Sequence, residues 1–138
     1  MNKRGPLVLV EDDADDQEMI VLALESLGLA KHTKIFHEPE SALNFLYESD
    51  VKPFLIISDM NMPKMDGLKF KETIESCRIL KDKRIPFVFL STASSESCIN
   101  RAYDLRVQGF FEKGKSFDDL KKSLNTILEY WNKCKLSN

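Results

Sequence analysis

The stretch from Phe54 to Gly67 constrains the fold of this chain more than any other part of the sequence. It begins with four successive apolar residues, Phe54 to Ile57, and passes through Ser58 and Asp59 into turn-forming residues. An apolar run without polar alternation predicts a strand buried on both faces, as in a parallel sheet covered by helices. Asp59 would then lie at the carboxyl end of that strand, the edge of an open α/β sheet where ligands bind. A carboxylate in that position is a helix cap, a metal ligand or a nucleophile.

Five apolar runs predict five strands. Three of them follow a proline, which is tolerated at the first residue of a strand because its missing N–H need not join the ladder. These three runs are Leu7 to Val10, Phe54 to Ile57 and Phe87 to Leu90, and weaker runs at Thr33 to Phe36 and Gly109 to Phe111 predict outer strands.

Helical patterns lie between and after these strands. Apolar residues at helical spacing predict helices near residues 13–27, 39–46, 68–77, 96–105 and 116–131. The alternation predicts an α/β fold: a flavodoxin-like, doubly wound sheet of five parallel strands in the order 2-1-3-4-5, with five helices. The polar residues that could cap these helices are Asp12 or Asp13, Ser94 or Ser95, and Ser116 with Asp119 in a capping-box pattern. In the helix near 96–105, Ile99, Ala102 and Tyr103 are expected to face inward.

Length and composition predict one cytoplasmic domain. The 138 residues are enough for one core, which predicts a single domain over residues 1–138 with a polar tail at 133–138 that frays. The net charge of −2 gives no pull toward nucleic acid or an anionic membrane, and no apolar run approaches the length of a membrane span or a secretory signal. Three cysteines without C-x-x-C spacing argue against a disulfide framework or a zinc site and fit a reducing cytoplasm.

The candidate site residues all follow strands. Glu11 and Asp12 follow the first strand, Asp59 the third, Thr92 the fourth and Lys113 the fifth. In a doubly wound sheet these strand ends open at one edge, and the first and third strands are neighbours at the switch point. Mg²⁺ prefers oxygen ligands and accepts one or two carboxylates. We therefore expect Asp12 and Asp59 to be its ligands, with Glu11 acting directly or through water.

Each of these residues also has an ordinary structural explanation. Asp12 could cap a helix, Asp59 could form a turn, Thr92 could be a cap and Lys113 could be a solvated surface lysine. Their joint placement at one sheet edge is harder to explain in that way. A cation, a hydroxyl and an ammonium group there would hold a phosphoryl group, with Asp59 as the nucleophile that forms an acyl phosphate.

These residues carry a resemblance to the receiver domains of two-component response regulators. The matching residues are Glu11-Asp12, the run Asp59-Met-Asn-Met-Pro-Lys-Met-Asp-Gly67, Thr92-Ala93 and Lys113, and the similarity spans about residues 6 to 131. The nine-residue run is highly specific, and the other motif positions fall at the expected strand ends. The short form, without an output domain, resembles chemotaxis-type receivers and small regulators paired with hybrid or phytochrome-like kinases.

The resemblance implies a phosphorylation switch rather than a conventional turnover enzyme. It implies that Asp59 accepts a phosphoryl group from a histidine kinase or hybrid kinase. It also implies a Mg²⁺ ion bound by Asp12, Asp59 and the backbone carbonyl of Asn61, with Glu11 assisting.

The resemblance further implies how the signal leaves the site. Thr92 and Lys113 would contact the phosphoryl group, and the aromatic ring of Phe110 would swing inward behind Thr92. That change would remodel the face formed by the last two helices and the last strand, where a downstream protein would bind and two copies could pair. Asn61 and Ser94 would tune autodephosphorylation by shaping the access of water. No direct contact with nucleic acid or membrane is expected.

Three positions depart from the pattern of the family. Gly114 stands where a proline usually follows the lysine, which loosens the turn or removes a cis peptide. Phe110 replaces a tyrosine, so no hydroxyl can form a hydrogen bond in either state. Glu112 directly precedes Lys113, and we expect its side chain to face solvent.

Three other functions fit the sequence less well than the receiver does. An aspartyl-phosphate phosphatase of the haloacid dehalogenase type needs a second aspartate two residues after its nucleophile as general acid, and Asn61 stands there. A flavodoxin-like electron carrier needs a phosphate loop after its first strand, where this chain has acids. A receiver that docks without phosphorylation remains the third alternative, although the phosphorylation residues are all present.

Overall fold

The structure is a computed structural model that describes residues 5–92 and 94–137, and its strands and helices alternate along the chain as predicted. The strands are β1 (Leu7–Val10), β2 (Thr33–Phe36), β3 (Leu55–Ser58), β4 (Phe87–Ser91) and β5 (Gly109–Glu112). The helices are α1 (Ala14–Ser26), α2 (Pro39–Glu48), α3 (Gly67–Ser76), α4 (Arg78–Asp82), α5 (Glu96–Asp104) and α6 (Phe117–Lys133), with a short 3-10 helix, η1 (Ala30–His32), before β2. Ala93 of the predicted motif and Asn138 of the predicted tail lie outside the described residues.

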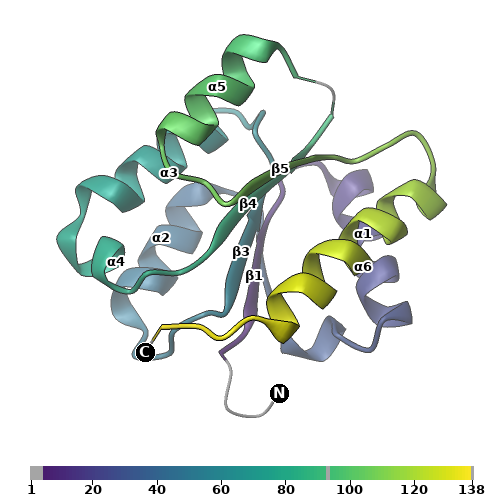
Figure 1. Cartoon of the computed structure of the whole chain (residues 1–138), viewed down its shortest axis with the longest axis horizontal. Coiled ribbons are helices and arrows are strands. Elements are labelled where there is room, and N and C mark those ends of the chain that lie inside the picture. Colours follow the sequence, from purple (N-terminus) through teal and green to yellow (C-terminus); the bar gives the residue numbers. More distant parts are fainter. Residues whose placement is uncertain (1–4, 93, 138) are drawn as a thin grey trace.

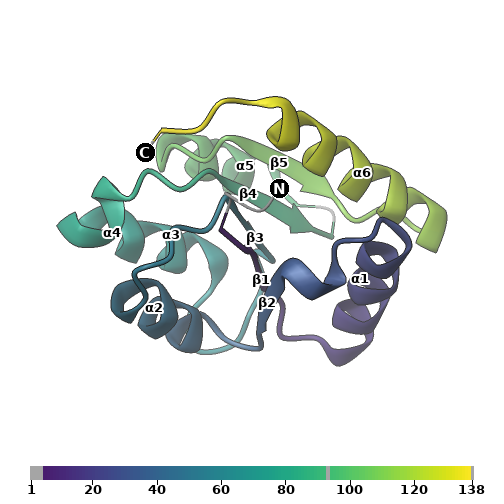
Figure 2. The ribbon, with the colours of Figure 1, turned by 90° about the horizontal axis from the view of Figure 1, so that it is seen from below.

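The sheet has the predicted doubly wound topology. All neighbouring strands are parallel, in the order β2-β1-β3-β4-β5. Figures 1 and 2 show α1 and α6 on one face of the sheet, with α2, α3, α4 and α5 on the other. The prediction of five helices was wrong, because the described residues form six α-helices. The additional helix is α4, whose five residues are too few to display an apolar period in the sequence.

The central strands supply both layers of the core. Val8 and Val10 of β1 pack against the layer of α2 to α5, whereas Leu7 and Leu9 pack against α1 and α6. Successive side chains of a strand point to opposite faces, so one uninterrupted apolar run fills two layers. All residues of β1 and β3 are buried, as expected of strands that are covered on both faces.

Side-chain caps fix the starts of α1, α3, α5 and α6. The Asp13 carboxylate accepts a hydrogen bond at 2.9 Å from the amide two residues on, and the Ser95 hydroxyl accepts one at 3.2 Å from the amide three residues on. Ser116 caps α6 as predicted. The Asp119 carboxylate, however, accepts from the Lys115 N–H at 3.3 Å, so the predicted capping box is not completed with Ser116.

One residue predicted to face inward from α5 does not. Ala102 is buried in the core, whereas Tyr103 is 52% exposed. Adjacent residues lie about 100° apart around a helix, so Ala102 and Tyr103 cannot both face the narrow stripe that the sheet covers.

The chain after α6 returns toward the start of β3. Leu136 packs against the core layer of α1 and α6, and the Lys52 Nζ donates a hydrogen bond to the Ser137 Oγ at 3.1 Å. In the part of the chain that the structure describes, no helix has both the length and the apolar character needed to cross a membrane.

Candidate functional site

The register of β1 and β3 builds an acidic edge at the carboxyl ends of these strands. Val10 pairs with Ser58, so the next residues, Glu11 and Asp59, leave the sheet side by side. The Asp59 N–H donates to the Val10 carbonyl at 2.9 Å, which continues the ladder up to the loop. The two strands therefore deliver carboxylates to one place, as the sequence predicts.

The two oxygens of the Asp59 carboxylate have different surroundings. Asp59 is 7% exposed, and its Oδ1 accepts hydrogen bonds from the Met60 N–H at 2.8 Å and from the Ser91 hydroxyl at 3.0 Å. Its Oδ2 lies 3.8 Å from the Lys113 Nζ. One oxygen is thus fixed by two donors, while the other keeps lone pairs for a ligand or an electrophile.

Three carboxylates are close enough to share one cation. Glu11, Asp12 and Asp59 each offer an oxygen, and these oxygens all lie within 4.8 Å of one another. Carboxylate oxygens suit a hard divalent cation such as Mg²⁺ or Mn²⁺, whereas softer metals prefer thiolate, thioether or imidazole ligands. Met60 and Met62, which follow Asp59, are buried in the core as packing residues. The donor set therefore fits the predicted magnesium ion.

Burial shifts the pKa values of the two acids that follow β1. Glu11 is 1% exposed, and burial raises the pKa of its carboxyl to about 7, although its hydrogen bond to Lys113 acts in the opposite direction. Burial also raises the pKa of Asp12, and the nearby Asp59 charge adds to that rise. Both acids hold their protons more tightly than in water, so binding of a cation by their ionised forms releases protons.

Lys113 is a buried cation that three carboxylates share. Its Nζ lies 2.7 Å from both the Glu11 Oε1 and the Asp16 Oδ2, and 3.8 Å from the Asp59 Oδ2. Burial lowers the pKa of Lys113, but the hydrogen bonds to Asp16 and Glu11 outweigh burial and raise it. Lys113 therefore remains charged, and in this state its close contacts are to residues other than Asp59.

Asp16 is a site residue that the sequence reasoning missed. Its carboxylate comes from the first turn of α1, which starts at the acidic edge directly after the Asp13 cap. Its place in the first turn of α1 could have identified Asp16 from the sequence. Side chains in the first turn of a helix that follows a strand lie close to the edge at which that strand ends.

Within the described ranges, the hydrogen bonds of the Asp59 carboxylate come from Met60 and Ser91 and not from Thr92 or Asn61, the two predicted residues of the neighbouring loops. Thr92 and Asn61 are exposed, and the Ser94 hydroxyl donates to the Thr92 carbonyl at 3.2 Å. Among the described residues, the hydroxyl that bonds to Asp59 belongs to Ser91, the last residue of β4, to which the sequence analysis assigned no role.

The structure shows the surroundings of the three positions that depart from the family pattern. Gly114 has φ +81°, in the left-handed region, and a Cβ there would lie 2.4 Å from the Asp119 Cβ. None of the peptide bonds in residues 5–92 and 94–137 is cis. Glu112 is exposed, as predicted, and the half-buried ring of Phe110 lies 5.6 Å from that of Phe89.

Comparison with known proteins identifies related sequences. The family described as the response regulator receiver domain matches residues 7–125 of this chain. The probable methanogenesis regulatory protein FilR2 of Methanothrix harundinacea is 32% identical over 129 residues, which cover 91% of this chain and 82% of that protein. The response regulator Rcp1 of Synechocystis is 31% identical over 130 residues, which cover 91% of this chain and 87% of that protein.

Two solved structures have the same fold. The phosphorylated cyanobacterial phytochrome response regulator RcpA matches with a TM-score of 0.86 at 30% identity, covering 98% of this chain and 99% of that chain. The Mn²⁺-bound form of response regulator Rcp1 matches with a TM-score of 0.82 at 28% identity, covering 97% and 99%. Sequence and fold agree over nearly the whole length, and the chain therefore belongs to the family of response regulator receiver domains.

Proposed function

We propose that this chain is a phosphorylation switch in which Asp59 accepts a phosphoryl group while Glu11, Asp12, Asp59 and the Asn61 carbonyl hold Mg²⁺. The observation that carries the proposal is the Asp59 carboxylate, whose Oδ1 is held by two hydrogen bonds and whose Oδ2 lies 3.8 Å from the Lys113 Nζ. Membership of a phosphoryl-accepting family supports the acceptor role. The Mn²⁺-bound form of Rcp1 supports a divalent cation.

The proposed phosphoryl donor is a histidine kinase or hybrid kinase. The similarity to a phytochrome response regulator, RcpA, supports a sensor kinase of the phytochrome-associated kind. Since the family's proteins act in signalling, the chain would pass the phosphoryl-dependent signal to a downstream protein instead of turning over a substrate.

The proposed transfer assigns a role to each group at the acidic edge. The Asp59 Oδ2 attacks the phosphorus of a phosphohistidine; the P–N bond breaks, its electron pair stays on the imidazole nitrogen, and an acyl phosphate forms. Mg²⁺, when bound, supplies positive charge to the phosphoryl oxygens. Lys113 and the Thr92 hydroxyl donate to the remaining oxygens. Water later hydrolyses the acyl phosphate, and Asn61 and Ser94 shape its access.

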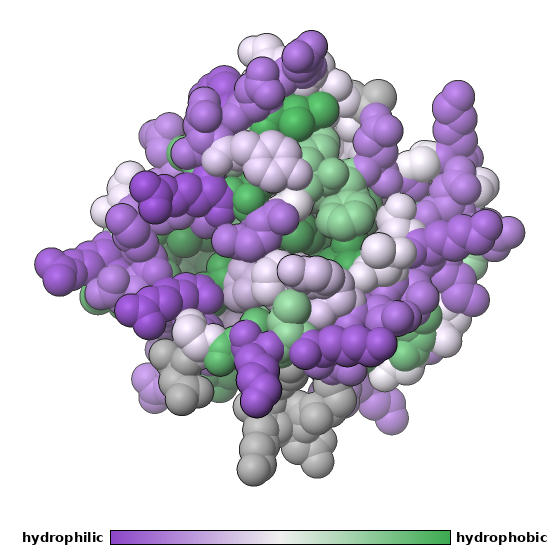
Figure 3. All heavy atoms as spheres, in the orientation of Figure 1, coloured by the Kyte–Doolittle hydropathy of each residue, from purple (hydrophilic) through white to green (hydrophobic). Residues whose placement is uncertain are grey.

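The face formed by α5, β5 and α6 is the proposed output surface. Figure 3 shows apolar surface between α5 and α6, framed by hydrophilic side chains. A groove of about 430 Å³ in this region is lined by Tyr103, Phe110 and Tyr130, among others. Movement of Thr92 toward the phosphoryl group would leave room for Phe110 to turn inward, which would reshape the groove. A downstream protein or a second copy of the chain would distinguish the two shapes.

Acetyl phosphate with Mg²⁺ tests the acceptor, followed by mass spectrometry of the intact protein. We expect wild type to gain one phosphoryl group and Asp59→Asn to gain none. Asp13→Asn is the matched control, because Asp13 is an exposed carboxylate close to the site whose hydrogen bond caps α1. It should be labelled like wild type. Equal labelling of wild type and Asp59→Asn would reject Asp59 as the acceptor.

A further inference from the structure

A second recess lies at the end of the sheet opposite the acidic edge. It is about 290 Å³ in volume and opens beside Pro86 and Gln108, the residues that directly precede β4 and β5. We call it the basic pocket, and its lining residues are Lys71, Ile74, Glu75, Leu80, Lys81, Arg84, Ile85, Pro86, Arg106, Gln108 and Trp131. None of these residues belongs to the acidic edge, whereas Gln108 and Trp131 also line the groove of the proposed output surface.

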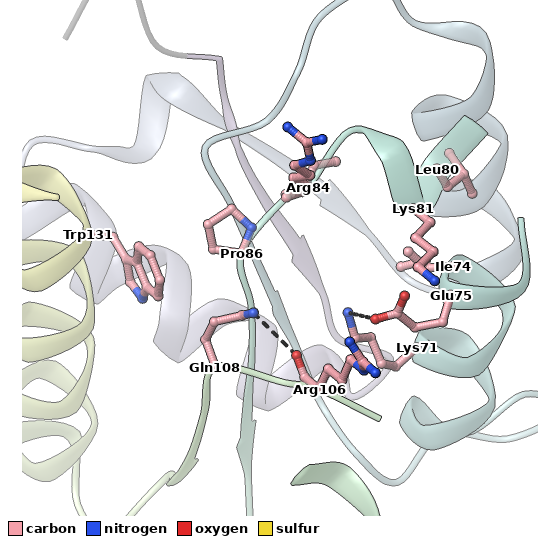
Figure 4. A pocket seen from close by; sticks show the side chains of 11 residues that line it. Lys71, Ile74, Glu75, Leu80, Lys81, Arg84, Pro86, Arg106, Gln108 and Trp131 are labelled. Carbon is pink, nitrogen blue, oxygen red and sulfur yellow. Dashed lines mark hydrogen bonds and ion pairs between the residues drawn. The ribbon is translucent and has the colours of Figure 1, made fainter. Parts of the chain in front are cut away.

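The basic pocket concentrates positive charge in a chain whose net charge is −2. Lys71, Lys81, Arg84 and Arg106 line it, against the single carboxylate of Glu75. Figure 4 shows Lys81 and Arg106 directed toward the ion pair of Lys71 and Glu75 from different elements. A recess that collects charge of one sign focuses the field and attracts ions of the opposite sign.

Only one of these cations has an acidic partner. Lys71 is 5% exposed, and its Nζ lies 3.2 Å from the Glu75 Oε1. Within residues 5–92 and 94–137, no carboxylate forms an ion pair with Lys81, Arg84 or Arg106. The carboxylate in the pocket therefore neutralises the buried lysine and leaves three cations available to a ligand.

The two arginines occupy backbone positions that favour glycine. Arg84 and Arg106 have φ values of +53° and +67°, and each stands directly after the last capping residue of a helix, α4 or α5. Gly28 occupies the same position after α1, with φ +77°. An L-residue is strained in this region. A cation near a helix carboxyl end gains some dipole energy, but that gain does not explain why both arginines line one recess.

We propose that the basic pocket binds a small phosphate-bearing anion, with its phosphate groups on Arg106 and Lys81 and its remaining part against the apolar wall that includes Trp131. The Arg84 side chain is directed away from Lys81 and Arg106 (Figure 4), and it adds positive charge to the pocket lining without sharing their point of contact. Guanidinium groups match phosphate oxygens two at a time. The volume lies at the lower end of small-molecule sites, so it suits a compact ligand better than a protein segment. In Figure 4, Trp131 lies across the recess from the cations, beyond Pro86 and Gln108.

Nuclear magnetic resonance titration of the isotope-labelled chain tests the proposal. Trp131 is the only tryptophan in the sequence, so its indole N–H gives a single reporter signal. The probes are pyrophosphate and ATP, added in EDTA so that no cation can bridge them to the acidic edge. We expect saturable shifts of the Trp131 indole and of the amides of Arg84 and Arg106. Adenosine, which lacks phosphate, should cause no saturable shift.

Two variants separate binding from folding. The double variant Arg84→Gly with Arg106→Gly should bind the probes about tenfold more weakly or worse. Its melting temperature should equal or exceed that of wild type, because glycine relieves both strained positions. Arg101→Gln is the matched control, since Arg101 is exposed on α5 and lies outside the pocket lining. This variant should bind the probes like wild type.

Three outcomes contradict the proposal. They are the absence of a saturable shift in wild type, an unchanged affinity in the double variant, and shifts caused by an octaglutamate peptide but not by the phosphate probes.

Discussion

The proposed phosphorylation of Asp59 would change the contacts of Lys113. In the state described here its close partners are Glu11 and Asp16, both at 2.7 Å, and Asp59 is farther away. A phosphoryl group on Asp59 would compete with both carboxylates for the same ammonium group. The strength of these contacts would therefore set part of the free energy of the proposed phosphorylation.

We predict that Asp16→Asn strengthens the binding of beryllofluoride, a mimic of the phosphoryl group, at Asp59. The substitution frees Lys113 from one carboxylate and removes a negative charge near the incoming anion, and both effects favour the bound state. A partly exposed ion pair is worth about 1 kcal/mol at most, so the affinity should rise up to about fivefold. Calorimetric titration with Mg²⁺ present measures it. Asp15→Asn, an exposed neighbour in the same turn, should leave the affinity unchanged; a weaker affinity in Asp16→Asn contradicts the prediction.

Glu11 should make the stability of the metal-free protein depend on pH. Its pKa is raised from 4.5 to about 7 in the folded state, so the folded state binds more protons than the unfolded state between these values. The free energy of unfolding should therefore fall as pH rises from about 5 to about 8, and saturating Mg²⁺ should oppose that fall by binding the ionised form. Denaturant titrations in EDTA measure the fall. Glu11→Gln should flatten it, and an equally steep fall in that variant excludes Glu11 as the cause.

At the scale of elements, the loop from Asp59 to α3 is held by close backbone packing. The Gly67 N–H donates to the Met60 carbonyl at 2.7 Å, and a Cβ at Gly67 would lie 2.4 Å from the Asp59 carbonyl oxygen. The same Cβ would lie 2.6 Å from the ring of Phe89. The end of β3 and the start of α3 can therefore approach this closely only because position 67 has no side chain.

We predict that Gly67→Ala destabilises the fold by about 2 kcal/mol, because the added methyl group forces backbone and ring atoms apart. Chemical denaturation measures the change. Gly28→Ala is the control: a Cβ at Gly28 meets no atom within 4 Å, so only its positive φ is strained, at a cost of about 1 kcal/mol. Equal costs at the two positions would show that close packing around Asp59 is not the limiting factor.

The sequence predicted the strands and helices wherever the pattern of apolar residues was strong. The strands β1, β3 and β4 were evident because an uninterrupted apolar run between turn residues has few alternatives in an α/β chain. The short α4 was missed because five residues carry no measurable period, and Tyr103 was misplaced because only tertiary packing decides which stripe of α5 is covered.

The site was predictable where a residue directly follows a strand. Glu11, Asp12 and Asp59 meet as expected because parallel strands end at one edge. The contacts of Asp16 and Ser91 were not predicted, because a hydrogen bond between residues distant in sequence depends on side-chain rotamers that no local pattern reveals. The structure shows where these residues lie, and the predicted roles of all the site residues, Asp59 and Lys113 included, stay predictions.

At the scale of the whole molecule, we predict that beryllofluoride with Mg²⁺ changes hydrogen exchange at a distance. A ligand that binds only the folded state slows exchange generally, and a remodelled output face should add changes in α5, β5 and α6. Mass spectrometry of deuterium uptake measures both. Helix α2 is the internal reference because it contacts β1 and β2, on the side of the sheet away from β5. Asp59→Asn should show neither effect, and equal changes in α2 and β5 contradict a directed switch.

The acidic edge and the basic pocket lie at opposite ends of the same parallel sheet, one after β1 and β3 and the other before β4 and β5, so this nearly neutral chain separates opposite charges across the sheet. Such a body has an electric dipole moment, and it rotates in the field of an approaching surface before the two touch. A partner with a cationic docking surface, such as the proposed kinase, would meet the acidic edge first, and dissolved salt would slow that encounter by shortening the reach of the field.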